Sequence, residues 1–195
     1  MNGKFTRYPA NFWQKIQMNA GIVVRGFDPE EKTYAAILGA TGDGTTFNPN
    51  PTYEDFGADI DNVPPNTWQL KRLKHYDPVL EGTFRTMDPA LGASLCPGTA
   101  DGGVIAPASD LTDAMFQDVT LLADYSHINA DDPGAGRAAG YMAVTIKKAL
   151  NTSGFQWKTN KEGKGEFAFS FHGHYDLNDP DGQPFEIYIM EPEEV

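Results

Sequence analysis

The 195-residue chain has one cysteine, no long apolar run and few basic side chains. With Cys96 alone, an internal disulfide is excluded, and no thiolate cluster is available for zinc or an iron–sulfur centre. No stretch approaches the roughly 18 apolar residues that a spanning helix needs. The opening MNGKFTRYPANFWQKIQMNA also lacks the uninterrupted apolar core of a signal peptide. We therefore expect no export signal and no membrane contact.

Basic charge is scarce because 27 acidic side chains face only 15 basic ones, a formal net charge of −12. Such a surface repels phosphate backbones at moderate salt, which argues against an ordinary nucleic-acid binder. The chain is rich in aromatics, glycine and proline, a composition that predicts a folded core joined by many turns. The length favours a single domain over 1–195.

Short apolar runs bounded by turn residues predict a mainly β fold. A first hairpin is expected from 21–27 and 34–40, on either side of the turn DPEEKT. The next strand, 68–75, is ambiguous because its leucines also suit a helical turn. The remaining strands are expected at 79–87, 119–125, 141–148, 155–159, 166–175 and 184–190.

Alternation along 166–175 predicts one buried face and one wet face. Phe167, Phe169, Phe171 and Tyr175 are expected in the core, and the intervening residues outside it.

Helix signals are few. Asp88 is placed as an N-cap, Pro89 as the first helical residue and Pro97-Gly98 as the stop. A second helical turn is expected in SDLTDAMF, capped by Ser109 and Asp113. The predicted architecture is an antiparallel β-sandwich or barrel with one short α-helix and a long loop after the first hairpin.

That loop, 41–66, contains GDG, NPNP and PP, and we expect it to have no secondary structure of its own. Its acidic stretch YEDFGADIDNVPPNTW suggests calcium binding by Asp55, Asp59 and Asp61. No glycine turn or bidentate glutamate completes such a site at a recognised spacing. An Asx-type turn at Asp61, followed by a stiff Pro64-Pro65 pair, is the favoured interpretation.

Metal-dependent catalysis has one candidate motif, the H-x-H of His172 and His174. A catalytic metal needs a third protein ligand, which would come from Glu166, Asp176, His75 or His127. Two histidines on a solvated strand face are the favoured interpretation. No G-x-S-x-G is present, and DLNDPDG departs from the calcium-loop order. We therefore predict no catalytic residue, metal ligand or cofactor.

Several segments together resemble a known family: GIVVRGFDPEEKTYAAILGATGDGTTFNPNPTYEDFGADIDNVPPNT, LEGTFRTMDPALGASL, DVTLLADYS, ALNTSGFQWKTNKEGKGEFAFSFHGHYDLND and PFEIYIMEPE. In this order they are similar to the major tail protein of siphophages and related prophages of Gram-positive bacteria, the subunit of the tail tube. The similarity covers almost the whole chain. The N-terminal segment 1–19, expected to be an arm, contributes little to it.

The resemblance implies a non-enzymatic virion protein: a β-sandwich that forms hexameric rings, stacked into a hollow tail tube assembled in the host cytoplasm. Its implied partners are other copies of itself, the tape measure protein and other tail proteins, while phage DNA passes through the lumen without specific binding. An acidic lumen wall would suit that role because it repels phosphate. In this family the loop matching 41–66 reaches a neighbouring ring and orders on assembly. The implied contact residues are Thr46, Phe47, Tyr53, Asp55, Phe56, Asp59, Asp61 and Asn62.

Two other functions remain open from the sequence. One is a cupin-like β-barrel metalloenzyme using His172 and His174. The other is a different ring-forming tail protein, such as a terminator or baseplate subunit, because related β-sandwiches recur along the tail and fold does not fix role.

Overall fold

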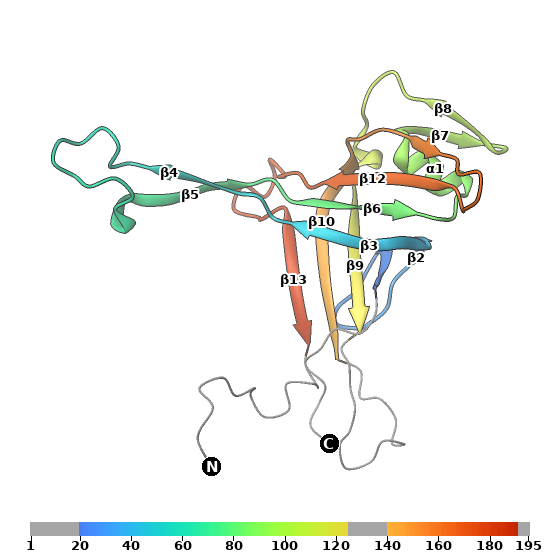
Figure 1. Ribbon diagram of the computed structural model, residues 1–195, viewed down its shortest axis with the longest axis horizontal. Coiled ribbons are helices and arrows are strands. Elements are labelled where there is room, and N and C mark those ends of the chain that lie inside the picture. The colour runs from blue at the N-terminus through green and yellow to red at the C-terminus, as the bar shows by residue number, and fades with distance from the viewer. Residues whose placement is uncertain (1–19, 125–139, 191–195) are drawn as a thin grey trace, which may run out of the picture.

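The computed structural model describes residues 20–124 and 140–190. The expected N-terminal arm, 1–19, lies outside the described residues, as does the predicted turn that contains His127. The described part is mainly β, with antiparallel sheets and one α-helix, as the sequence predicts (Figure 1). Within 20–124 and 140–190, no helix has the length and apolar character needed to cross a bilayer.

Two sheets form the body of the molecule. The first has the order β2-β1-β9-β10-β13 and the second has the order β3-β6-β12-β11, with antiparallel pairing throughout. Strands of the second sheet run across those of the first (Figure 1), as in an orthogonally packed sandwich. The strands of the first sheet are β1 (Ile22–Arg25), β2 (Ala36–Gly39), β9 (Gln117–Asp124), β10 (Tyr141–Asn151) and β13 (Phe185–Met190). Those of the second are β3 (Thr41–Asn48), β6 (Val79–Phe84), β11 (Gln156–Lys158) and β12 (Glu166–His172).

Strand β10 joins the two sheets. Its register with β9 shifts between Ile146 and Ala149, and Lys148 at this bulge has a φ of 48°. Beyond the bulge, Leu150 and Asn151 pair with β12 instead. A bulge bends a strand, so it allows one continuous strand to turn the corner of the sandwich.

Asn151 fixes this corner from within the protein. Its side chain is buried, and its Nδ2 donates to the carbonyl of Leu95 at 2.8 Å. Its Oδ1 accepts a hydrogen bond from the Ser170 N–H, also at 2.8 Å. The corner is therefore tied to the helix end on one side and to β12 on the other.

The core lies between the sheets and beneath the helix. Phe84 and Phe169 are fully or almost fully buried, with ring centroids 4.4 Å apart. The helix α1 (Pro89–Leu95) closes this space with Leu91 and Leu95. The predicted N-cap is confirmed, since Asp88 Oδ1 accepts a hydrogen bond from the Leu91 N–H at 2.7 Å.

The predicted face of β12 is confirmed for Phe169 and Phe171, which are buried. The prediction for Tyr175 is wrong, because the strand ends at His172 and Tyr175 is exposed. The chain leaves the ladder there because Gly173 and His174 donate their N–H groups to carbonyls of other segments.

Two other local predictions also need correction. SDLTDAMF contains only the 3₁₀ turn η3 (Asp113–Met115), whose N-cap, Thr112, makes no side-chain capping bond, so the expected Ser109 cap is wrong. An unpredicted hairpin, β7 (Gly98–Asp101) with β8 (Val104–Pro107), turns through Gly102 and Gly103 at positive φ. The apolar run of β8 is only four residues long, and the sequence GTAD of β7 has no apolar alternation, so neither was recognised as a strand.

The largest correction concerns 41–66, which is not a structureless loop. It contains β3 and β4 (Pro51–Asp55), both paired in antiparallel ladders. The ambiguous 68–75 segment holds both predicted alternatives, the 3₁₀ turn η2 (Trp68–Leu70) followed by β5 (Lys71–Tyr76). β3 and β4 are strands because their backbones pair with β6 and β5, although their side chains show little apolar alternation.

Replacing Phe84 with alanine should lower the free energy of unfolding by about 3–5 kcal/mol, because it leaves a cavity beside Phe169. Urea denaturation measures the change. Leu177→Ala is the matched control, since Leu177 is 99% exposed and its truncation should cost less than about 0.5 kcal/mol. A similar small cost for both variants would contradict the assigned core.

Candidate functional site

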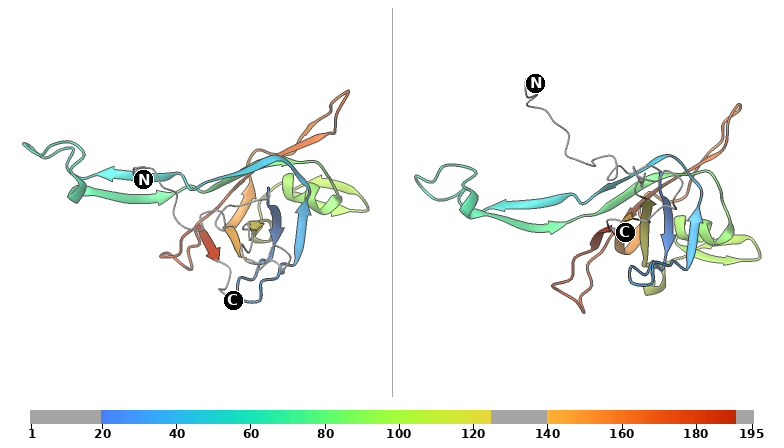
Figure 2. Two further views of the ribbon diagram at one scale, coloured as in Figure 1. Left: turned by 60° about the horizontal axis from the view of Figure 1, so that its bottom comes forward. Right: turned by 90° about the horizontal axis from the view of Figure 1, so that it is seen from below.

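A long hairpin projects from the body. β3 continues into β4, and β5 continues into β6, so the outer part of the hairpin carries β4 paired only with β5 (Figures 1 and 2). We call residues 51–76 the hairpin arm. Among residues 20–124 and 140–190, no sheet or helix covers its strands.

The strands of the hairpin arm expose both faces. One face has Tyr53 opposite Leu73, with Lys71 Nζ 5.3 Å from the Tyr53 ring centroid. The other has Glu54 opposite Arg72. All five residues are exposed. An isolated two-stranded hairpin is marginally stable in water, so this arm needs a further contact to be stably ordered.

The tip of the hairpin arm is folded on itself. Asp55 Oδ1 accepts the Gly57 N–H at 2.9 Å, and its Oδ2 accepts the Asn66 N–H at 3.1 Å. Asn62 and Asn66 have positive φ angles, 64° and 61°, which asparagine tolerates better than most residues. Gly57 is buried, and a Cβ there would lie 2.8 Å from Leu70 Cδ1. The tip therefore has a defined shape.

The acidic stretch forms an Asx-type turn at its first aspartate. Asp55 closes the turn with both carboxylate oxygens, while Asp59 and Asp61 are exposed. The Asx-type turn forms at Asp55 rather than at Asp61. Across the described ranges, no three His, Cys, Asp or Glu side chains gather closely enough to hold a metal. The carboxylates are not arranged as a calcium site.

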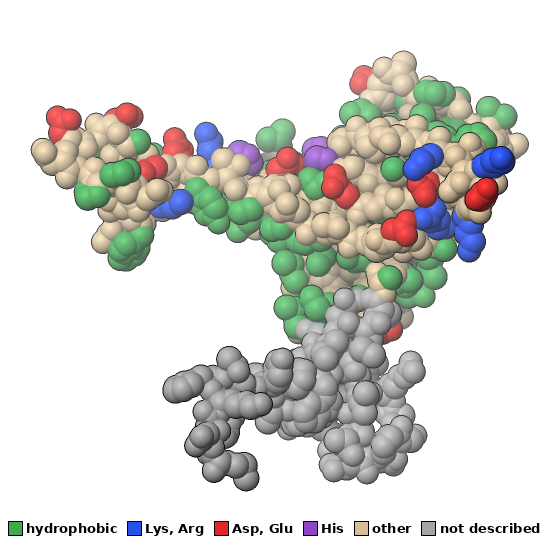
Figure 3. Space-filling view, viewed as in Figure 1, with side chains coloured by type: hydrophobic (Ala, Val, Ile, Leu, Met, Phe, Trp, Pro, Cys, Tyr) green, Lys and Arg blue, Asp and Glu red, His purple; other side chains and the backbone are tan. Residues whose placement is uncertain are grey.

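Large apolar side chains are exposed along the hairpin arm and its tip. Their exposed fractions reach 79% at Trp68 and exceed 45% at every member of the group (Figure 3). Such a concentration on a projection is typical of an interaction surface. The members are Tyr53, Phe56, Ile60, Trp68 and Leu73.

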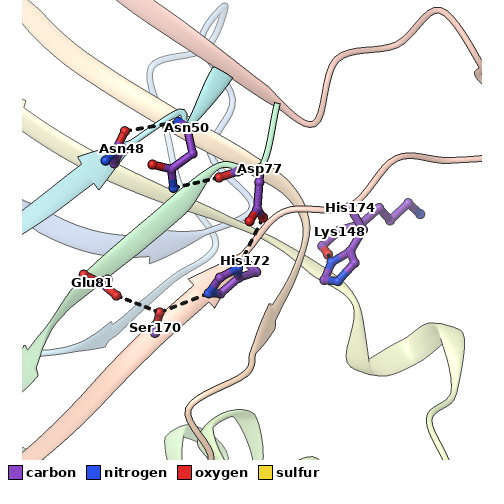
Figure 4. A network of polar contacts seen from close by, with 8 residues as sticks. All are labelled: Asn48, Asn50, Asp77, Glu81, Lys148, Ser170, His172 and His174. Atoms are coloured by element: carbon purple, nitrogen blue, oxygen red, sulfur yellow. Dashed lines mark hydrogen bonds and ion pairs between the residues drawn. The ribbon is translucent and has the colours of Figure 1, made fainter. Parts of the chain in front are cut away.

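A polar network fixes the root of the hairpin arm (Figure 4). Asn50, at a φ of 41°, donates its side-chain amide to the carbonyl of Asp77 at 3.1 Å. The Asp77 carboxylate lies 3.3 Å from Nδ1 of His172, whose Nε2 lies 3.3 Å from Ser170 Oγ. The Tyr76 ring packs edge-on against the Phe185 ring, with 5.1 Å between the ring centroids. These contacts link both strands of the root to the body.

The H-x-H pair does not form one metal-binding face. Whereas His172 contacts Asp77, His174 donates from Nδ1 to the carbonyl of Lys148 at 2.8 Å and packs edge-on against Phe116 (Figure 4). The strand ends between the two histidines, so the expected alternation does not apply to His174.

The proposed third ligands have other partners or lie elsewhere. Hydrogen bonds from the Asn178 backbone and side chain lower the pKa of Asp176. Glu166 accepts a hydrogen bond from Arg85 at 2.9 Å, which lowers its pKa. His75 is on the hairpin arm, in β5. The arrangement gives no support to a metalloenzyme.

The residues predicted for assembly divide into two groups. Thr46 and Phe47 lie in β3 of the body, opposite Glu81 and Leu80, and Phe47 packs against the core. The others lie on the hairpin arm and its tip: Tyr53, Asp55, Phe56, Asp59, Asp61 and Asn62. Sequence reasoning missed Ile60, Trp68 and Leu73. Their only signal was that they are apolar residues in a segment with no helical or strand periodicity.

A scan of the chain against protein-family models finds no match, and a search of curated proteins also finds none.

Asp55→Ala should loosen the tip, because it removes the acceptor for two backbone N–H groups. At about 1 kcal/mol for the lost bonds, amides in 56–66 should exchange about fivefold faster with solvent. Hydrogen-exchange mass spectrometry measures this directly. Asp59→Ala removes an equal charge without a bond and should leave exchange unchanged, so equal effects of the two variants would contradict the assigned role of Asp55.

Proposed function

We propose that this chain is a structural subunit of a phage tail tube, forming hexameric rings that stack into a conduit for DNA. The observation that carries the proposal is the hairpin arm, a projection whose apolar side chains face solvent in the single chain. In this role the arm contacts neighbouring copies. The resemblance to siphophage major tail proteins supplies the identity of the assembly.

Burial favours assembly on energetic grounds. A side chain such as Trp68 or Phe56 contributes on the order of 1.5–3 kcal/mol when it moves from water into an apolar contact. The monomer leaves both more than half exposed. Contact with another copy would bury them and give the two-stranded arm the cover that it lacks.

Open sheet edges support the same conclusion. Within the described ranges, β13 pairs only with β10 and β2 only with β1, so the first sheet has two free edges. Ile187 and Ile189 on β13 are about half exposed. A ring of subunits would cover such edges, which otherwise invite uncontrolled pairing.

The net charge of −12 suits a conduit, because an acidic wall would not bind the DNA that slides past it. The proposed location is the virion tail, with the tape measure protein and other tail proteins as further partners. A terminator or baseplate ring differs in one observable property, since it closes as a single ring whereas a tube subunit polymerises.

Replacing 51–76 with Asn-Gly should yield a folded monomer that forms no tubes. The Asp77 N–H donates to the Asn50 carbonyl at 3.3 Å, the bond that a two-residue hairpin turn requires, so the body should close without strain. Light scattering and negative-stain electron microscopy measure assembly, and urea denaturation tests the fold. Tubes formed as readily as by the full chain would contradict the proposal.

A point-mutant pair tests the same surface without deletion. Phe56→Ala with Trp68→Ala should raise the concentration needed for assembly at least tenfold, since each truncation removes more than about 1.4 kcal/mol of contact. Val104→Ala with Leu111→Ala is the control, because those side chains are also half or more exposed but lie outside the hairpin arm. Equal behaviour of the two pairs would argue against a role for the tip.

A further inference from the structure

A second hairpin projects from the end of the body opposite the hairpin arm. Strands β11 and β12 extend beyond the sandwich in the direction away from β4 and β5 (Figure 2). Trp157 on this hairpin is 65% exposed and stacks over Phe167, at 6.3 Å between ring centroids. Phe155 beside it is 42% exposed. This hairpin therefore has an apolar surface of its own.

The turn of this second hairpin is basic in an acidic chain. Residues 158–164 contain three lysines and one glutamate, a net charge of +2. Lys158 lies 3.4 Å from Glu166, while Lys161 and Lys164 are exposed and have no ion-pair partner among the described residues. At this end of the molecule, Lys and Arg side chains lie among Asp and Glu side chains (Figure 3).

The tip of the hairpin arm has the opposite charge. Residues 54–66 contain four acidic side chains and no basic one, a net charge of −4. Asp59 and Asp61 are exposed, in the same tip as the apolar side chains of Phe56 and Ile60. The two projecting ends are thus complementary in charge, and each adds exposed aromatic surface.

We propose that the acidic tip of the hairpin arm docks on the β11–β12 hairpin of a second copy of this chain. The inference rests on the proposed function and identifies the surface that receives the arm. Because the two surfaces differ and lie at opposite ends, the contact is head-to-tail, the kind that closes rings or extends filaments. Aromatic side chains would provide burial, and the charges would select the register.

A second copy of this chain is favoured over other partners because each subunit carries both complementary surfaces. Each subunit has one acidic tip and one basic β11–β12 hairpin, so the two surfaces are present in equal numbers and every arm can dock on one hairpin. Nucleic acid does not fit the arm, whose tip would repel phosphate. A single ion pair at an exposed site contributes little, so several charges and the aromatic groups must act together.

A charge exchange tests this contact. Asp59→Lys with Asp61→Lys should raise the critical concentration for assembly about tenfold through like-charge repulsion with the lysine turn. Lys161→Glu with Lys164→Glu should do the same. All four substitutions together should restore assembly to within about threefold of the unmodified chain, because the charges are again complementary.

The control is Glu30→Lys with Glu31→Lys, which makes the same change in net charge at two exposed positions in the turn between β1 and β2. It should assemble like the unmodified chain. Light scattering gives the critical concentration, and circular dichroism verifies the fold of each variant. Reversal variants that behave like this control, or a fourfold variant that is not rescued, would overturn the pairing.

Failure of the pairing is distinguishable from failure of the proposed function. If the unmodified chain assembles and the chain lacking 51–76 does not, while charge reversal has no effect, the arm docks elsewhere and only the pairing is wrong. If the unmodified chain never assembles, the proposed function itself is contradicted.

A direct proximity test is the variant Cys96→Ser, Asp59→Cys, Lys161→Cys, which should form intermolecular disulfides. Placing the second cysteine at Glu31, in the turn between β1 and β2, should abolish them, and equal cross-linking from both positions would overturn the pairing.

Discussion

The pairing of β4 with β5 is the interaction on which the rest of the functional account depends. It prolongs the β3–β6 ladder past the edge of the sandwich, where no other element of the described part of the chain covers it. Backbone hydrogen bonds alone rarely stabilise two strands in water. The arm is therefore a paired hairpin that lacks a covering layer, and its exposed aromatic side chains indicate that contact with an apolar surface supplies this cover.

The body determines where this arm points. Asn50 and Asp77 join its two strands, and Asp77 is joined to β12 through His172. Tyr76 rests against Phe185 of the first sheet. The root therefore directs the arm away from the body, while the pairing of β4 with β5 beyond the root stays marginally stable until another contact covers it.

The sequence allowed most of the body to be predicted, because the signals there are physical and local. Strands such as β9, β10 and β13 alternate or run apolar, and the helix has both its cap and its initial proline. The hairpin arm was missed because its strands expose both faces, so they carry no apolar period, and Pro51 suggested a loop although proline is tolerated as a first strand residue.

The root network was equally invisible to sequence reasoning. His172 was recognised as chemically notable, but its partner Asp77 is 95 positions away, and only the fold brings them together. Of the residues expected to mediate assembly, six lie on the hairpin arm, and their contact with another copy stays a prediction. Phe47 instead packs against the core, which a single aromatic residue inside the predicted loop 41–66 did not indicate.

Hydrogen exchange of the backbone amides in 51–76, measured at protein concentrations below and above the onset of assembly, tests the central claim most directly. The account predicts that these amides exchange rapidly in the dilute monomer, while those of β9 and β10 are already protected, and that assembly protects the arm. Amides of the arm that are as protected as the body in the monomer, or that remain unprotected in assembled particles, would contradict it.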